Sequence, residues 1–189
     1  MTDPDAARFE RAATMFREQV SLVGDDQWSA ATPCSEWDVR ALVNHVVVEM
    51  LWAPPLLAGR TIAEVGDSFD GDQLGTDPAA SCDRATHGAI EAFTVDGALA
   101  GQVHLSYGDE SAVGYCTQMT LDALIHGWDL ATAVGADATM PEELTQWAVA
   151  AVEPMQDMLS ASGMFGSPLA IDADAGTQAR LLAMLGRTG

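Results

Sequence analysis

The sequence contains no lysine, and its eight basic residues are arginines set against 28 acidic residues, for a formal net charge of −20. Without a lysine amine the chain cannot form a Schiff base, bind pyridoxal phosphate covalently or use a Walker A lysine. A surface this acidic repels the phosphates of nucleic acids and anionic lipids. We therefore expect neither nucleic acid nor a membrane as partner, and we interpret the charge as a solvated surface that keeps the protein soluble.

Long apolar runs and paired cysteines are also lacking. No run reaches the roughly 18 apolar residues that a membrane-spanning helix needs. The three cysteines are odd in number and show no C-x-x-C spacing, and the N-terminus is acidic rather than basic and apolar. These absences predict a cytoplasmic protein with reduced thiols.

What the sequence does contain is helical periodicity. Its 189 residues show no break in composition, which favours one domain over residues 1–189 with a single large core. The pattern predicts an all-α fold: a bundle of four or five long amphipathic helices with a short additional helix and one or two short strands. Apolar spacing and caps place helices at about 4–23, 35–53, 77–96, 112–134, 141–160 and 179–185, and one strand candidate without an evident partner at 102–107.

Local signals set the expected ends of the second helix. Ser35-Glu36-Trp37-Asp38 matches the capping-box pattern, so we expect the helix to open there. Pro54 and Pro55 are expected to end or bend it. The segment 59–76 is rich in Gly and Asp and is predicted to be a surface loop.

Asp122 and His126 lie four residues apart in the long predicted helix 112–134. Both side chains therefore leave the same face, about 6 Å apart along the axis, which suits a metal ion. His45, on the apolar side of the second helix, can supply a third ligand if the two helices are neighbours. Taken alone, an Asp-x-x-x-His spacing is a weak signal, and a hydrogen-bonded pair is the commoner explanation.

Two carboxylates near these residues have alternative interpretations. Asp129 could accept a hydrogen bond from a ligating histidine, or it could cap the helix or pair with Arg40. Glu49, one turn past His45, could be a fourth ligand or a general base, although a solvated or ion-paired residue is the commoner case. Three further residues near the motifs are predicted to be packing residues: Trp37, Trp128 and Cys34.

The residues before His45 carry a family signature. The run Thr32-Pro33-Cys34-Ser35-Glu36-Trp37-Asp38-Val39-Arg40-Ala41-Leu42 closely resembles the T-P-C-x-x-W-x-V-R-x-L-x-x-H signature of the mycothiol-dependent maleylpyruvate isomerase N-terminal family, within the DinB/YfiT-like superfamily. The segment from Asp122 to Ala131 resembles its H-G-W-D-L-A motif. Phe165-Gly166 and residues 180–187 resemble the ending of a compact subgroup of metal-binding proteins, so the resemblance covers nearly the whole chain.

The resemblance implies a DinB-like four-helix bundle that holds a divalent metal, usually zinc or nickel. By matching positions, the ligands are His45, Asp122 and His126. There are two departures from the isomerase proper. Asp122 stands where the isomerase has glutamate, and 189 residues leave too little room for its C-terminal domain, so part of the isomerase's substrate site is expected to be absent.

Two histidines and one carboxylate would leave a coordination position open, as in catalytic zinc sites. A thiol entering that position would be deprotonated at neutral pH. We therefore expect a metal-dependent thiol S-transferase or isomerase, with a mycothiol-like low-molecular-weight thiol and a small electrophile as partners. The alternative is a non-catalytic metal-binding or sensing module with an interaction role. A monomer and a homodimer are both compatible with the sequence.

Overall fold

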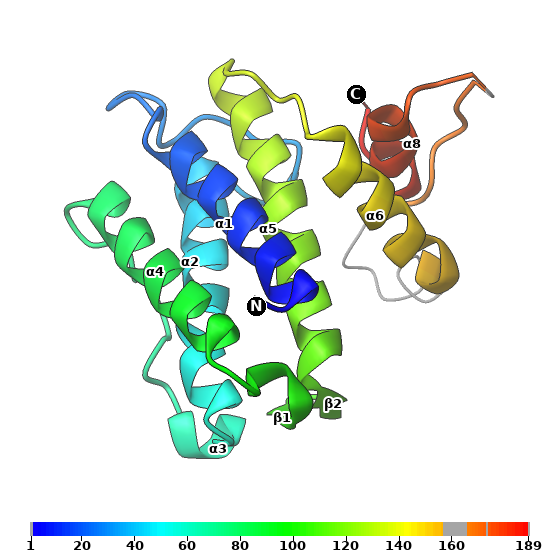
Figure 1. Cartoon of the computed structure of the whole chain (residues 1–189). Helices are drawn as coiled ribbons and strands as arrows, with labels where there is room; N and C mark the ends of the chain where they lie inside the picture. Colours follow the sequence, from blue (N-terminus) through cyan, green and yellow to red (C-terminus); the bar gives the residue numbers. More distant parts are fainter. Residues whose placement is uncertain (1, 157–165, 173, 189) are drawn as a thin grey trace. The chain divides into compact units, whose positions relative to one another are not determined.

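The computed structural model describes residues 2–156, 166–172 and 174–188. The chain forms two compact units, residues 1–138 and 139–189, each described by itself below. In the first unit four helices run side by side (Figure 1), and the all-α prediction is confirmed. The four helices are α1 (Pro4–Val20), α2 (Val39–Leu57), α4 (Pro78–Thr94) and α5 (Ala112–Val134). Helix α1 contacts α4 and α5, and helix α2 contacts the same two helices, which closes the bundle.

Capping residues in the sequence explain where α1 begins and where α5 begins and ends. The Asp3 side chain accepts a hydrogen bond from the backbone N–H of Asp5, and Pro4 occupies the first turn, where no N–H is needed. The hydroxyl of Ser111 caps α5 in the same way, through Gly114 N–H. Gly135 ends α5 with a φ of 72°, which a residue with a Cβ rarely adopts.

The predicted start of α2 at Ser35 is wrong. The helix begins after Asp38, whose side chain accepts from the N–H of Ala41. The preceding residues form a turn instead, because Trp37 N–H bonds to the carbonyl of Cys34 and Val39 N–H reaches back to Ala30. At the other end Pro54 and Pro55 lie within the last turn, since their fixed φ is compatible with helix.

Three short elements of the first unit were not predicted from the sequence, and one of them is the 3-10 turn Ala98–Ala100 after α4. Within the predicted loop 59–76, residues Ile62–Val65 form α3, which is held by a capping box between Thr61 and Glu64. The strand candidate also has a partner: β1 (Gln102–Leu105) pairs antiparallel with β2 (Gly108–Ser111). The second strand is polar throughout, so alternation of apolar residues could not reveal it.

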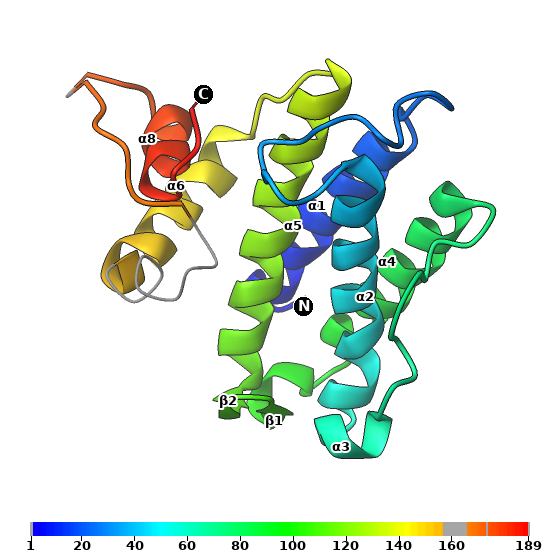
Figure 2. The same ribbon diagram turned by 180° about the vertical axis from the view of Figure 1, so that it is seen from behind.

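The inner faces of the four helices supply the core. Phe9 and Phe93 meet at 4.6 Å between ring centroids, joining α1 to α4. Fully buried side chains from the other two helices fill the rest: Leu42, Met50, Ile125 and Leu130. Figure 2 shows α2 and α5 next to each other, and His45, Asp122 and His126 lie on these two helices.

In the second unit α6 (Glu142–Val152) packs against α8 (Thr177–Met184), and a 3-10 turn, Glu153–Met155, follows α6. The predicted continuation of that helix to Ser160 lies outside the described residues. Two glycine backbones approach each other closely within this unit: a Cβ on Gly186 would meet Gly166 at 2.6 Å. A single folding domain over residues 1–189 remains a prediction.

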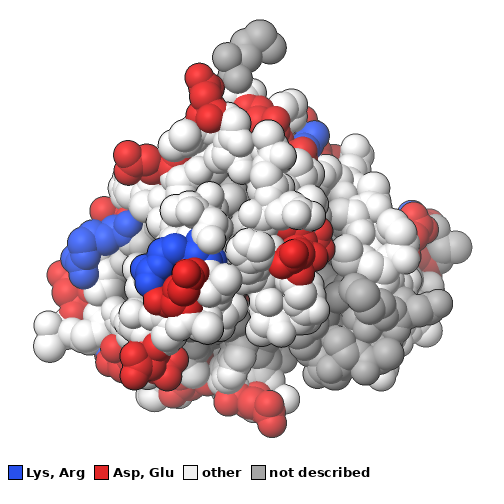
Figure 3. Space-filling view, turned by 90° about the horizontal axis from the view of Figure 1, so that it is seen from below, with Lys and Arg blue, Asp and Glu red and all other residues white. Residues whose placement is uncertain are grey.

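The surface has the acidic character expected from the composition. Figure 3 shows acidic groups dispersed over the face drawn there, with few basic ones. Across the described part of the chain, no helix has both the length and the apolarity needed to cross a membrane.

Candidate metal centre

His45 lies on the side of helix α2 that faces α5. Val43, Val46 and Val47 are buried around it, whereas the His45 side chain keeps 30% of its surface exposed. Its Nε2 lies 3.4 Å from Oδ1 of Asp122 on α5. The two helices are thus neighbours, as the sequence analysis required for a shared site.

Helix α5 supplies the other two side chains of the predicted triad. His126, one turn after Asp122, places its Nε2 3.4 Å from the same Oδ1 atom. One ligand atom from each of His45, Asp122 and His126 lies within 4.8 Å of the others. Ligands about 2 Å from a tetrahedral ion lie roughly 3.4 Å apart, so the spacing suits a first-row divalent metal.

The second oxygen of Asp122 supports this fit. Oδ2 is buried and has no hydrogen-bond partner among the described residues. A buried carboxylate oxygen without a partner is costly, and a cation would satisfy it. Burial alone would raise the pKa of Asp122, but the imidazoles of His126 and His45 outweigh it and hold that pKa well below its usual range.

The other ring nitrogen of His126 has a partner of its own. Nδ1 lies 3.0 Å from Oδ2 of Asp129, a fully buried residue one turn further along α5. Arg40, the alternative partner considered for Asp129, donates instead to Asp72 at 2.7 Å. The geometry therefore favours the first alternative, in which Asp129 orients His126 so that Nε2 faces Asp122.

Electrostatics around His126 follow from this arrangement. Burial acts to lower the pKa of His126, but Asp122, Asp129 and the Cys34 thiol counter it, and the pKa lies well above its usual value. In the metal-free protein the two carboxylates thus favour the protonated form of the imidazole. A divalent ion at Nε2 would take the place of that proton.

Cys34 belongs to this cluster, which the sequence analysis did not foresee. Its Sγ lies 3.3 Å from Oδ2 of Asp129 and 3.8 Å from Nδ1 of His126. The thiol is half-buried, unlike Cys82 and Cys116, which are buried and whose pKa values burial raises to about 11 and about 12. The position of Cys34 in the family signature that precedes His45 was the one sequence feature that could have indicated this placement.

The prediction that Trp37 is a packing residue of the core is wrong. Trp37 is half-buried, and its ring lies 4.6 Å from that of His45 and 5.5 Å from that of His126, measured between centroids. The turn that replaced the expected first turn of α2 brings it there. Trp128, by contrast, is buried as predicted, with 6% of its surface exposed.

Glu49 stands apart from the three converging side chains. It is half-buried one turn after His45, and no hydrogen bond or ion pair to it is found within residues 2–156, 166–172 and 174–188. Burial raises its pKa, and repulsion from Asp122 adds to this, while His45 and His126 act in the opposite sense. Its role as fourth ligand or general base remains a prediction.

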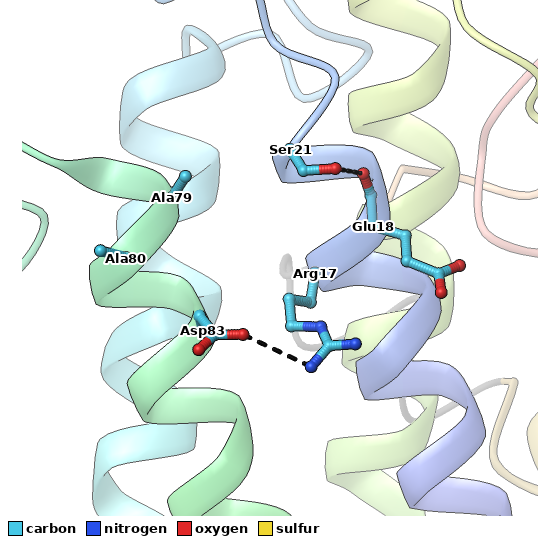
Figure 4. Close-up of a pocket in the computed structure, with 6 residues that line it drawn as sticks. All are labelled: Arg17, Glu18, Ser21, Ala79, Ala80 and Asp83. Carbon is cyan, nitrogen blue, oxygen red and sulfur yellow. Dashed lines mark hydrogen bonds and ion pairs between the residues drawn. The ribbon is translucent and has the colours of Figure 1, made fainter.

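A separate depression of about 370 Å³ lies between α1 and α4 (Figure 4). Arg17 reaches Asp83 across it at 3.4 Å. None of the triad residues lines it; the lining consists of Arg17, Glu18, Ser21, Ala79, Ala80 and Asp83.

The fold and the site together define a helical bundle with a His/Asp/His cluster between two of its helices. Residues 9–131 match the sequence profile of the mycothiol maleylpyruvate isomerase N-terminal domain. The chain therefore belongs to that family, and the resemblance seen in the motifs is confirmed.

Individual proteins and solved structures are also similar to this chain. Two uncharacterized proteins of Mycobacterium tuberculosis, from strains CDC 1551 and H37Rv, are each 29% identical over 151 residues, covering 77% of this chain and 76% of theirs. Crystal structures of the mycothiol-dependent maleylpyruvate isomerase and of a histidine-to-alanine variant share the fold, with a TM-score of 0.62. They are 15% identical in sequence, with 89% of this chain and 75% of theirs covered.

Proposed function

We propose that this chain binds a divalent metal ion through His45, Asp122 and His126. With that ion bound, the protein acts as a metal-dependent thiol S-transferase or isomerase. The observation that carries the proposal is the convergence of two histidine nitrogens on Oδ1 of Asp122, whose second oxygen is buried and has no partner among the described residues. Imidazole and carboxylate donors suit zinc and nickel, the two metals expected from the family.

The chain's own residues prepare such a site. Asp129 accepts the Nδ1 proton of His126 and so directs the lone pair of Nε2 toward Asp122. Trp37 covers the rings of both histidines on one side. When bound, a divalent ion with an open position lowers the pKa of a thiol enough to give a thiolate at neutral pH.

The thiol that we assign is of the mycothiol type, by analogy with the isomerase named by the family and by the structural match. Its partner would be a small electrophile. A cytoplasmic location, where low-molecular-weight thiols stay reduced, belongs to the same proposal.

The number of protein donors bears on the alternative of a non-catalytic binding module. A structural metal site is usually closed by four protein ligands, whereas a catalytic one keeps a position open. In the described residues three donors converge, and Glu49 does not join them. The exposed fractions of His45 and Asp122, 30% and 25%, also leave room for an exogenous ligand, which favours the enzyme.

Metal analysis of protein purified without a chelating tag tests the ligand assignment. We expect close to one equivalent of zinc or nickel in the wild type and a loss of most of it in His126→Ala. His87→Ala is the matched control, because His87 is exposed on α4 and faces Asp83 instead of the triad. Equal metal content in all three proteins would disprove the assignment.

Thiol consumption tests the activity. Metal-loaded protein would be incubated with mycothiol and a panel of small electrophiles, and loss of free thiol would be followed over time. We expect turnover that disappears on metal removal and in His126→Ala. Metal binding without any metal-dependent turnover would leave the binding module as the better account.

A further inference from the structure

Cys34, Asp129 and His126 form a second group of possible metal ligands next to the triad. One donor atom from each lies within 4.8 Å of the other two. His126 contributes Nδ1 to this group, whereas its Nε2 faces Asp122 in the triad. Within the described ranges neither of the other two cysteines belongs to such a group. The function proposed above uses Asp129 only to orient His126 and gives the thiol no part.

The three donor atoms have nearly the spacing of ligands around a tetrahedral ion. Oδ2 of Asp129 lies 3.3 Å from Sγ of Cys34 and 3.0 Å from Nδ1 of His126, and Sγ lies 3.8 Å from Nδ1. Bonds of about 2.3 Å to sulfur and about 2.1 Å to nitrogen and oxygen, at tetrahedral angles, place ligands about 3.4 to 3.6 Å apart. Each side of the observed triangle differs from that range by a few tenths of an ångström, which small side-chain shifts can supply.

The turn before α2 holds the thiol in this position. The hydroxyl of Thr32 accepts the backbone N–H of Cys34 and donates to the carbonyl of Trp37, whose own N–H bonds to the carbonyl of Cys34. Asp129 is fully buried and His126 is 7% exposed, so packing around α5 restrains these two donors. Cys34 is half-buried, which gives an ion from solvent access to the group.

We infer that Cys34, Asp129 and His126 bind a thiophilic divalent ion, zinc or cadmium, at a second site that shares only His126 with the triad. Such ions prefer thiolate and imidazole donors, whereas calcium and magnesium prefer oxygen donors. One ion replaces two protons, because the thiol proton and the Nδ1 proton that Oδ2 now accepts both pass to solvent. The Nε2 proton then stays on the neutral ring and faces Asp122, so the ring serves one of the two sites at a time.

A cadmium titration tests the site without reference to turnover. Cadmium bound to a thiolate gives an ultraviolet charge-transfer band, and cadmium bound only to imidazole and carboxylate does not. We expect the band in the wild type and in Cys82→Ser, the matched control at a buried cysteine, and its loss in Cys34→Ser. A band of equal size in Cys34→Ser, or no band in folded wild-type protein, would overturn the inference.

Variants of the other two donors distinguish a three-ligand site from a lone thiolate. Asp129→Asn and His126→Ala should each raise the dissociation constant read from the band by at least the roughly tenfold that loss of an outer carboxylate costs. Asp83→Asn, which removes an equal charge from an exposed pair with Arg17, should leave it unchanged. Thermal unfolding shows that the metal-free variants are folded. An unchanged dissociation constant in both Asp129→Asn and His126→Ala would also overturn the inference.

His45→Ala separates the two sites, because His45 belongs to the triad alone. This variant should lose the metal bound at the triad and keep the cadmium–thiolate band. Loss of the band in folded His45→Ala would overturn the second site. Retention of both the band and the wild-type zinc content would instead overturn the ligand assignment of the proposed function and leave this inference intact.

Discussion

Asp129→Asn should weaken metal binding although Asp129 is not one of the three proposed ligands. The carboxylate of Asp129 accepts the Nδ1 proton of His126 at 3.0 Å, which fixes the ring and increases the basicity of Nε2. Asparagine keeps the shape of the side chain and can still accept that hydrogen bond, but it removes the negative charge. The variant therefore isolates the electrostatic contribution of Asp129.

The size of the effect follows from the geometry. Across the imidazole ring, the Asp129 carboxylate would lie about 6.5 Å from an ion at Nε2, where a unit charge and a divalent ion interact by about 1 to 5 kcal/mol for effective dielectric constants between 80 and 20. Measured effects of such outer carboxylates, about 10- to 100-fold in metal affinity, fall in this range. We expect the dissociation constant for zinc to rise by about that factor in Asp129→Asn.

Competition with a chromophoric chelator measures the affinity, and thermal unfolding of the metal-free proteins shows whether the variant is folded. Asp83→Asn is the control, because it removes an equal charge from an exposed pair with Arg17. A dissociation constant in Asp129→Asn that matches those of the wild type and Asp83→Asn would refute the assigned role of Asp129.

Three further outcomes are expected. In the native protein a thiol reagent should modify Cys34 first, and the two buried cysteines only on unfolding, since burial raises their pKa values to about 11 and about 12; peptide mapping checks this, and equal rates for all three would contradict it. Gly186→Ala should destabilise the protein by about 1 to 3 kcal/mol in chemical denaturation, because Gly186 has a φ of 75° and the new Cβ would meet Gly166 at 2.6 Å; unchanged stability would count against that contact. Because the pKa of His126 is raised above 6.5 when folded, the stability that it adds to the metal-free protein is complete below pH 6.5 and is lost as the pH rises through the folded value; Asp122→Asn should flatten this dependence.

Helical periodicity was sufficient to predict the main elements of the bundle. Apolar residues every three to four positions, with Asp3-Pro4 and Gly135 at helix ends, predicted the start of α1 and both ends of α5, whereas α1 ends at Val20 and not at the predicted residue 23. The start of α2 was misplaced because two capping patterns overlap within four residues, and Asp38 has the better geometry once Trp37 N–H bonds to Cys34. Local sequence does not reveal which of two caps the surrounding loop will permit.

The triad was predictable in part. The four-residue spacing placed Asp122 and His126 on one helical face, but the neighbourhood of α2 and α5 is a tertiary fact that spacing alone does not contain. The family signature supplied it, since it joined His45 to the later motif. Glu49 was named from its spacing to His45 alone, and its role stays a prediction because that spacing does not show what it faces across the two helices.

The turn before α2 explains why the residues ahead of His45 form a signature at all. Had the helix begun at Ser35, Trp37 and Cys34 would have lain along its axis, a turn or more away from the histidine rings. Starting the helix after Asp38 instead lets the turn fold back, so that the indole covers His45 and His126 while the thiol reaches Asp129. One short segment thus lies against both histidine rings and also contacts the carboxylate that hydrogen-bonds to His126. A substitution that moved the start of α2, such as Asp38→Ala, should therefore lower the zinc content found by metal analysis, through the positions of Trp37 and Cys34, although Asp38 is not one of the proposed ligands.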